Sequence, residues 1–300
     1  MVRSTGLLTK ERTVRALLVL ALAVIATAGA AAIAWAAEPH PWQLGFQPAA
    51  TPVEARLESF NNELTVIIGL ITVFVLGLLL YTIVRFDARR HPVPTRTTHN
   101  TVIEILWTVV PVIILVIIAI PSFKLMYYMA RVPPPGLTIK VTGHQWYWSY
   151  AYPDQGGLAF DSNLVQEADL KPGQIRLLTA DNPLVVPVDT NIRVLITSTD
   201  VMHDWFVPSF GVQEYAIVGR DNETWFRVEH PGTYHGQCDQ ICGINHAFMP
   251  VEVKAVAKDE FQRWLADAKK KFAHNGNGAA VRVAAIPGSV GTVGPAPAGN

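Results

Sequence analysis

Five side chains that bind soft metal ions are concentrated in the C-terminal half of the sequence. Cys238, Cys242, His246 and Met249 fall within twelve residues, each three or four positions after the last. A second imidazole, His203, lies upstream of them. Thiolate, thioether and imidazole groups together favour copper, zinc or iron–sulfur clusters. The types and spacing of these residues therefore predict a metal centre.

The number of ligands favours a pair of copper ions. A mononuclear blue-copper site uses one cysteine, two histidines and a weak axial methionine, so this chain has one thiolate too many for it. Two thiolates can instead bridge two copper ions, with one histidine for each and with Met249 and a backbone carbonyl as weak axial contacts. Such a pair shares one electron between two metals with little change of geometry, which suits electron transfer.

Two other interpretations of the cysteine pair stay open at this point. A Cys2His2 zinc site fits the count, but the usual two-plus-two spacing is absent and Met249 has no role in it. A disulfide between Cys238 and Cys242 would close a very short loop and stabilise little. It would also leave His246 and Met249 unexplained.

The apolar residues are concentrated near the N-terminus and predict a membrane anchor. Charged residues make up 16% of the chain and the net charge is zero, so no basic field points to nucleic acid. Residues 1–37 combine basic residues, an alanine-rich run and a small-residue motif, which predicts a secretory signal peptide. Two later runs, at about 64–84 and 105–123, are long enough to span a bilayer. The arginine-rich loop between them should be cytoplasmic, which places everything after residue 130 outside.

Beyond a proline-rich hinge at 133–136, short alternating runs separated by turn residues predict an all-β domain, a Greek-key sandwich or barrel. The predicted strands are 137–142, 146–152, 175–178, 191–197, 224–228 and 251–255. The expected divisions are a helical hairpin at 53–130 with a lead-in helix at 53–62, a β domain at 131–258, a C-terminal helix at 259–274 and a disordered tail at 275–300.

The sequence resembles subunit II of cytochrome c oxidase, a family with a binuclear copper centre called CuA. The run from Cys238 to Met249 with His203 upstream carries the resemblance, together with Gly-His-Gln-Trp-Tyr-Trp-Ser-Tyr at 143–150, Phe-Gly-Val at 210–212 and the segment 104–122. The resemblance implies a membrane-anchored, cupredoxin-like β fold. It also implies these copper ligands: His203, Cys238, the carbonyl of Gln240, Cys242, His246 and Met249.

Function, partners and location follow from the same resemblance. Trp146 matches the aromatic residue that receives electrons from cytochrome c, and Glu104 matches a glutamate at the mouth of a proton-uptake path. The chain would pass electrons to haem in subunit I, where oxygen is reduced to water and protons are pumped. Subunit I, subunit III, cytochrome c and membrane lipid are the expected partners. The expected location is the bacterial inner membrane, as a multi-pass protein with its copper domain on the periplasmic side.

Three departures from the family pattern bear on cofactor and donor. Gln240 stands where the family has a glutamate that helps bind magnesium, and an amide brings no negative charge to a hard cation, so a magnesium ion is doubtful. The segment 213–220 lacks a lysine, an aspartate and a proline of the family run. Acids expected near the aromatic motif are replaced by Ala151 and Gly157, which leaves Asp154, Asp161, Asp181 and Asp200 as candidates. A donor that is less basic than usual, or membrane-anchored, would need less electrostatic steering.

Three other functions fit parts of the pattern. A quinol oxidase subunit II would act as a structural and docking module, but it would be expected to lack the copper ligands. A nitrous oxide reductase carries the same motif but needs a large catalytic domain for which this chain has no room. A free-standing membrane-tethered copper protein remains the third alternative.

Overall fold

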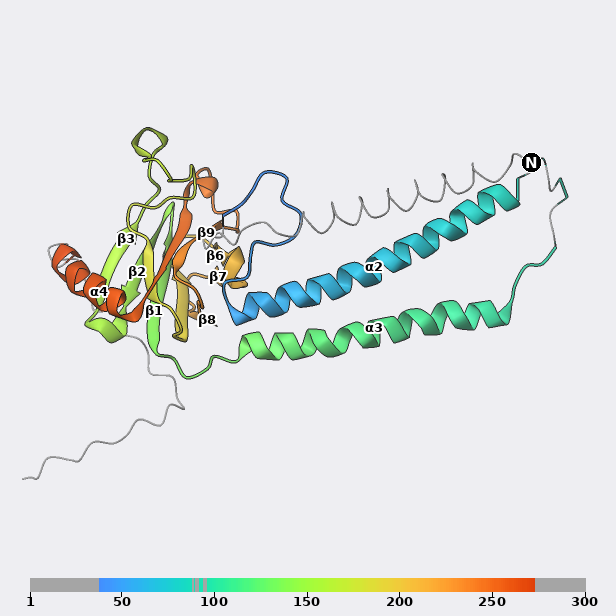
Figure 1. Ribbon diagram of the computed structural model, residues 1–300, viewed down its shortest axis with the longest axis horizontal. Helices are drawn as coiled ribbons and strands as arrows, with labels where there is room; N and C mark the ends of the chain where they lie inside the picture. The colour runs from blue at the N-terminus through green and yellow to red at the C-terminus, as the bar shows by residue number, and fades with distance from the viewer. Residues whose placement is uncertain (1–37, 88, 90–91, 94–95, 273–300) are drawn as a thin grey trace, which may run out of the picture. The chain divides into compact units, whose positions relative to one another are not determined.

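The computed structural model describes residues 38–272, except 88, 90–91 and 94–95. The predicted signal peptide and the predicted disordered tail lie outside the described residues. Within them, two long apolar helices precede a β sandwich that ends in a third helix (Figure 1). The predicted fold class, an apolar helical hairpin followed by an all-β domain, is confirmed.

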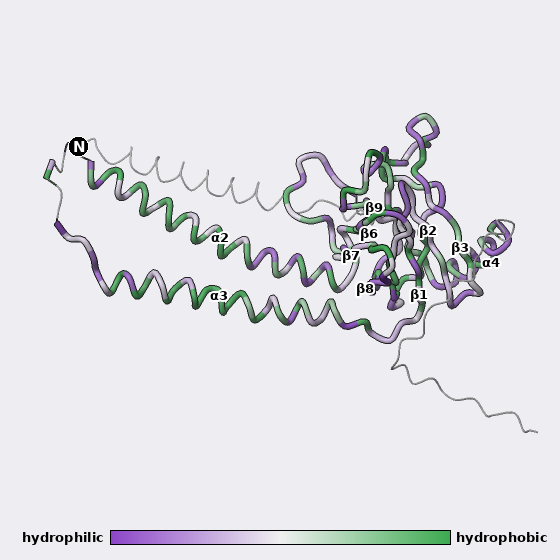
Figure 2. The backbone as a smooth tube through the Cα atoms, turned by 180° about the vertical axis from the view of Figure 1, so that it is seen from behind, coloured by the Kyte–Doolittle hydropathy of each residue, from purple (hydrophilic) through white to green (hydrophobic). Residues whose placement is uncertain are grey.

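The first helix of the hairpin, α2, runs from Pro52 to Arg85, and the second, α3, from Thr101 to Ala130. Each begins where a polar side chain caps it: the Thr51 hydroxyl accepts the N–H of Glu54, and the Asn100 carboxamide accepts the N–H groups of Val102 and Ile103. Caps of this kind satisfy donors that have no partner within the helix. Both helices are long and apolar enough to cross a membrane, and Figure 2 shows hydrophobic residues along them.

The predicted lead-in helix and the first predicted membrane span form one continuous helix. No proline or glycine lies between Asn62 and Leu64, and the helix continues through them. A helix of this length spans about 50 Å, which exceeds the roughly 30 Å of a bilayer's hydrocarbon core. Its first turn reaches the β domain, where the Thr51 hydroxyl donates to the carbonyl of Phe210 over 2.7 Å.

Two five-stranded sheets form the sandwich. One sheet has the order β3-β2-β1-β5-β8 and the other the order β4-β10-β9-β6-β7. Most neighbouring strands are antiparallel, but β1 pairs with β5, and β4 with β10, in parallel. The strands are β1 (Leu137–His144), β2 (Tyr147–Tyr152), β3 (Leu158–Ser162), β4 (Leu184–Pro187), β5 (Ile192–Ser198), β6 (His203–Val207), β7 (Val212–Ala216), β8 (Asn222–Phe226), β9 (Gly232–Cys238) and β10 (Pro250–Val256).

The core lies between the sheets and is rich in aromatic residues. Trp148, Trp205, Tyr150, Tyr152 and Phe226 are all fully buried. The buried hydroxyl of Tyr152 donates to the carbonyl of Val185 over 2.8 Å, which gives this polar atom the partner that burial requires. The C-terminal helix α4 (Lys258–Phe272) contributes Phe261 and Leu265 to the same core.

The predicted strand at 175–178 is wrong, because this segment forms turns. The N–H of Leu178 bonds back to the carbonyl of Ile175, and Leu177 has a positive φ of 65°. Leu178 is nonetheless buried, so its apolar character reflects packing rather than a strand. The sequence patterns missed β3, β4, β6, β7 and β9, which are short or interrupted by glycine, proline or polar residues.

Candidate metal centre

The centre lies at the ends of two neighbouring strands and in the loop that follows one of them. His203 begins β6 and Cys238 ends β9, and these strands pair where Trp205 lies opposite Cys238. Cys242, His246 and Met249 follow in the loop between β9 and β10. The antiparallel pairing of β9 with β10 closes this loop and returns Met249 to the site, where its carbonyl accepts the N–H of Cys238 over 3.3 Å.

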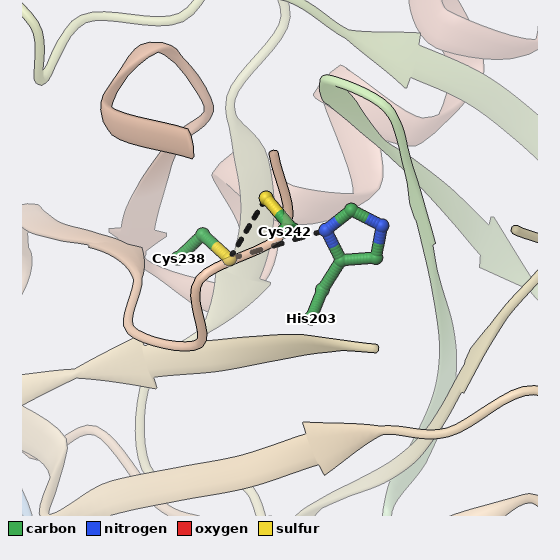
Figure 3. Close-up of side chains that lie close together, drawn as sticks. All are labelled: His203, Cys238 and Cys242. Carbon is green, nitrogen blue, oxygen red and sulfur yellow. Dashed lines mark hydrogen bonds between the residues drawn. The ribbon is translucent and has the colours of Figure 1, made fainter. Parts of the chain in front are cut away.

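The two sulfurs form the middle of the cluster. Cys238 Sγ lies 3.9 Å from Cys242 Sγ and 3.9 Å from His203 Nδ1, as Figure 3 shows. The ligand atoms of these three residues all lie within 4.8 Å of one another. The cysteines are free, because 3.9 Å is far longer than the roughly 2.05 Å of a disulfide bond.

The remaining predicted ligands approach the same sulfurs. His246 Nδ1 and Met249 Sδ each lie 3.6 Å from Cys242 Sγ, and the carbonyl oxygen of Gln240 lies 3.3 Å from Cys238 Sγ. Met249 is only 1% exposed. The structure therefore brings together all five predicted side chains and the predicted carbonyl.

Asp200 orients the imidazole of His203, a role that sequence reasoning missed. Its carboxylate accepts a hydrogen bond from His203 Nε2 over 2.9 Å, which leaves Nδ1 facing Cys238 Sγ. Carboxylates that orient metal-binding histidines in this way raise the basicity of the ligand. The three-residue spacing from Asp200 to His203 is a sequence signal that could have suggested the pair.

Further hydrogen bonds hold Asp200 itself. The N–H groups of Gln145 and Val201 donate to its two oxygens over 2.7 and 2.6 Å. Burial raises the pKa of Asp200, but the hydrogen bonds from His203, Val201 and Gln145 outweigh it, so the pKa lies below its usual value. Asp200 is therefore ionised at neutral pH and acts as an acceptor for all its partners.

The thiols of Cys238 and Cys242 are both buried. Burial raises the pKa of Cys238, and burial together with the neighbouring Cys238 raises the pKa of Cys242 to about 12. Without a metal ion, both thiols keep their protons at neutral pH. Because a metal binds the thiolate form, loading of this centre must release those protons.

Trp146 lies directly beside the metal-binding loop. Its ring is half-buried, and its Nε1–H donates to the carbonyl of Cys242 over 3.3 Å. The side chain of Gln145 donates to the same carbonyl over 2.8 Å. Gly243 allows this approach, since a Cβ there would lie 3.0 Å from the Trp146 ring and the residue has a positive φ of 125°. Trp146 therefore connects the surface with the backbone of Cys242, one of the predicted metal ligands.

Two glycines that sequence reasoning missed allow close packing around the ligands. A Cβ at Gly143 would lie 2.8 Å from the ring of His203, and a Cβ at Gly236 would lie 1.9 Å from the carbonyl oxygen of Phe206. A side chain at Gly143 would displace the His203 ring, and one at Gly236 would push apart β9 and β6, the strands that hold Cys238 and His203. Glycine is therefore a packing requirement of the centre.

Glu104 lies far along the chain from the cluster, in the first turn of α3. Its Oε1 accepts the N–H of Asn100 over 3.2 Å, which satisfies one donor at the start of the helix. The structure thus gives Glu104 a capping contact and does not bring it to the metal-binding residues.

The donor set fits two copper ions better than one zinc ion. Metal–thiolate bonds measure about 2.3 Å, so sulfurs 3.9 Å apart can both contact the same metal and can do so for two metals. A single tetrahedral zinc would use four ligands and leave the buried thioether of Met249 without a function. A thioether beside thiolates and imidazoles favours copper.

Comparison with known proteins gives matches along most of the chain. A family model described as cytochrome c oxidase subunit II, periplasmic domain, matches residues 137–256, and one described as its transmembrane domain matches residues 39–125. The probable cytochrome c oxidase subunit 2 of Rickettsia bellii is 49% identical over 242 residues, which cover 81% of this chain and 90% of the relative.

Relatives from other organisms match to a similar degree. Cytochrome c oxidase subunit 2 of Oenothera berteroana is 47% identical over 234 residues, 76% of this chain and 91% of the relative. Among solved structures, the periplasmic domain of subunit II of the Bradyrhizobium japonicum cytochrome oxidase is 52% identical, with a TM-score of 0.45. The match covers 47% of this chain and 99% of the Bradyrhizobium japonicum domain.

Proposed function

The chain belongs to the cytochrome c oxidase subunit II family, and from this premise we propose that its β domain holds a CuA centre that accepts electrons from a cytochrome c. It is the electron-transfer subunit of a haem–copper cytochrome c oxidase, an oxidoreductase, and is anchored in a membrane with the β domain on the periplasmic side. The single observation that carries the copper proposal is the convergence of His203, His246 and Met249 on the sulfurs of Cys238 and Cys242.

The proposed ligands are His203, Cys238, Cys242, His246 and Met249, with the carbonyl of Gln240. A copper pair held by these residues would accept and release one electron at a time. Two features of the chain would favour such a centre. Asp200 fixes the orientation of His203, and burial of Cys238, Cys242 and Met249 keeps water away from the sulfurs.

We assign to Trp146 the role of the residue through which electrons arrive. Its hydrogen bond to the carbonyl of Cys242 connects the indole to a ligand through one non-covalent contact. Large aromatic residues also make effective docking contacts, because they bury much area at low entropic cost. Glu104 is proposed to receive protons at the opposite end of α3, in addition to its capping contact with Asn100.

The test compares Trp146→Ala with a matched aromatic control in the assembled oxidase. Trp264→Ala removes an indole that lies in α4 and packs against Tyr152, away from the predicted ligands. Stopped-flow oxidation of reduced cytochrome c should slow by at least about 30-fold in Trp146→Ala, the loss expected for a docking hot spot. Electron transfer in Trp264→Ala should stay near the rate of the parent protein. Equal rates for the parent and Trp146→Ala would contradict the assignment.

The partners we propose are subunit I, subunit III and a cytochrome c that is weakly basic or membrane-anchored. The four candidate acids are all engaged locally: Asp154 accepts the N–H of Thr138, and Asp161, Asp181 and Asp200 accept bonds from Ser149, Asn163 and His203. Because few acids lie near the aromatic motif, electron transfer from a strongly basic cytochrome c should depend only weakly on salt concentration. A steep fall in its rate with rising salt would refute this view of the donor.

The proposed location is the bacterial inner membrane. The proposed divisions of the chain remain the signal peptide at 1–37, the hairpin at 53–130, the copper domain at 131–258, the C-terminal helix at 259–274 and the tail at 275–300. The arginine-rich connection between α2 and α3 supports a cytoplasmic loop, by the positive-inside rule.

A further inference from the structure

A groove lies where the two membrane helices meet the β domain. It has a volume of about 940 Å³, within the usual size range of small-molecule sites. Its lining comes from four parts of the chain: α2, the end of α3 with the hinge that follows, Asn191 just before β5, and the segment around β8. It is therefore formed by the folded chain as a whole rather than by one element.

An aromatic wall gives the groove a fixed shape. Trp225 of β8 is 6% exposed, and its Nε1–H donates to the carbonyl of Met129 over 3.1 Å. The ring of Tyr128 meets the Trp225 ring edge to face at 5.6 Å, and the guanidinium of Arg56 lies 3.8 Å above the Tyr128 ring. The stack of Arg56, Tyr128 and Trp225 joins α2, α3 and β8 before any ligand binds.

The charges that line the groove are all positive. They belong to Arg56, Lys124, Arg131 and Arg227, and no acidic side chain is among the lining residues. Arg227 has an ion pair with Glu229 at 3.4 Å. Among the described residues, no salt bridge involves Arg56, Lys124 or Arg131. Arg56 stacks on Tyr128, but no carboxylate in the described part of the chain neutralises any of these three cations, so all three can attract an anionic ligand.

The position of these cations is not explained by membrane topology. Basic residues normally collect in the cytoplasmic loops, whereas this cluster is at the ends of the helices that face the β domain. Exposed apolar side chains continue along α3 from the groove: Ile120 and Phe123 are 56% and 57% exposed, about one to two turns before Tyr127. A ligand with an anionic head and apolar chains matches both features.

We propose that this groove binds the headgroup of an anionic glycerophospholipid of the outer leaflet. The phosphate contacts Arg56, Lys124 and Arg131, the glycerol region packs against Tyr127 and Tyr128, and the acyl chains follow the exposed aliphatic side chains of α3. Basic pockets between membrane helices bind such headgroups on electrostatic grounds. The lipid would link α2, α3 and β8 at the membrane surface and so hold the β domain against the helices.

The test measures the lipid retained by the intact oxidase. The complex is purified from nanodiscs that contain phosphatidylglycerol and phosphatidylcholine, and native mass spectrometry counts the lipids that remain bound. The variant Arg56→Gln/Lys124→Gln/Arg131→Gln removes the three free cations of the groove. The matched control, Arg85→Gln/Arg89→Gln/Arg96→Gln, removes three arginines at the opposite ends of the helices.

The parent and the control should retain phosphatidylglycerol in preference to phosphatidylcholine. Each neutralised cation should weaken binding about fivefold, so the groove variant should bind on the order of 100-fold more weakly. Single variants at each position give the same test if the triple variant does not assemble. Equal loss in the groove and control variants would overturn the proposal, as would equal retention of phosphatidylcholine. Displacement of the lipid by inorganic phosphate would point to a free-anion site, and absence of any retained lipid would show that another subunit fills the groove.

Discussion

Replacing Asp200 by asparagine tests whether this carboxylate orients His203 for metal binding. The side chain keeps its size but loses its charge, and one of its two acceptor oxygens becomes an NH2 group. At the Oδ2 position that group would face the N–H of Gln145 at 2.7 Å, donor against donor. At the Oδ1 position it would face two donors, the N–H of Val201 and His203 Nε2–H, so two hydrogen bonds would be lost instead of one.

The expected magnitude follows from these contacts. The variant loses the bond to Gln145 and the charge assistance of the bond to His203, and hydrogen bonds to charged groups contribute about 1.5–3 kcal/mol each. Loss of a partner that orients a metal ligand typically weakens metal binding about 10- to 100-fold, or roughly 1.4–2.7 kcal/mol. We therefore expect copper affinity to fall by that factor while the five ligand side chains remain present.

Competition titration against a copper chelator measures this loss on the full chain in detergent. Asp181→Asn is the matched control, because Asp181 accepts the N–H of Asn163 over 2.7 Å and its hydrogen bonds are with Asn163 rather than with a predicted ligand. Circular dichroism would show that both variants are folded. Unchanged copper affinity in Asp200→Asn, or an equal loss in Asp181→Asn, would refute the role given to Asp200.

Two further predictions concern packing and pH. Gly236→Ala places a methyl group 1.9 Å from the carbonyl oxygen of Phe206, so it should destabilise the domain by about 1–3 kcal/mol or more in urea unfolding. Ala159→Val on the exposed side of β3 should change stability by less than about 0.5 kcal/mol, and similar losses for both would contradict the packing argument. Burial raises the pKa of Glu252 above its ordinary value of 4.5, so the folded state keeps this proton after the unfolded chain has lost it, and stability falls as pH rises through that window. Glu252→Gln should remove this fall in thermal unfolding scans between pH 4 and 7, and parallel curves for parent and variant would contradict it.

The ligands could be predicted from the sequence because most of them are close in the chain. Cys238, Cys242, His246 and Met249 occupy one loop, so their spacing already limits where their side chains can meet. His203 joins them through the pairing of β6 with β9, a contact that the family motif supplied and the strand pattern did not. The two apolar helices were predictable for a similar reason, since hydropathy over a long window is a local property.

The remaining features depend on contacts between distant segments. Asp200 was considered as a surface acid, and its actual partners, His203 and Gln145, become visible only when the loop after β5 lies beside the end of β1. Gly236 is required because the backbone of β6 passes directly over it. Ile175 to Leu178 was predicted as a strand because burial and strand formation leave the same apolar signature in four residues.

The most direct test of the central claim is the metal content of the purified full chain together with its near-infrared absorption. Loaded with copper, the chain should bind two copper ions per molecule and show a mixed-valence absorption band. Both properties should be lost in Cys238→Ser and in Cys242→Ser. One copper per chain, a tightly bound zinc ion, or a disulfide between Cys238 and Cys242 that persists with copper in excess would contradict the account.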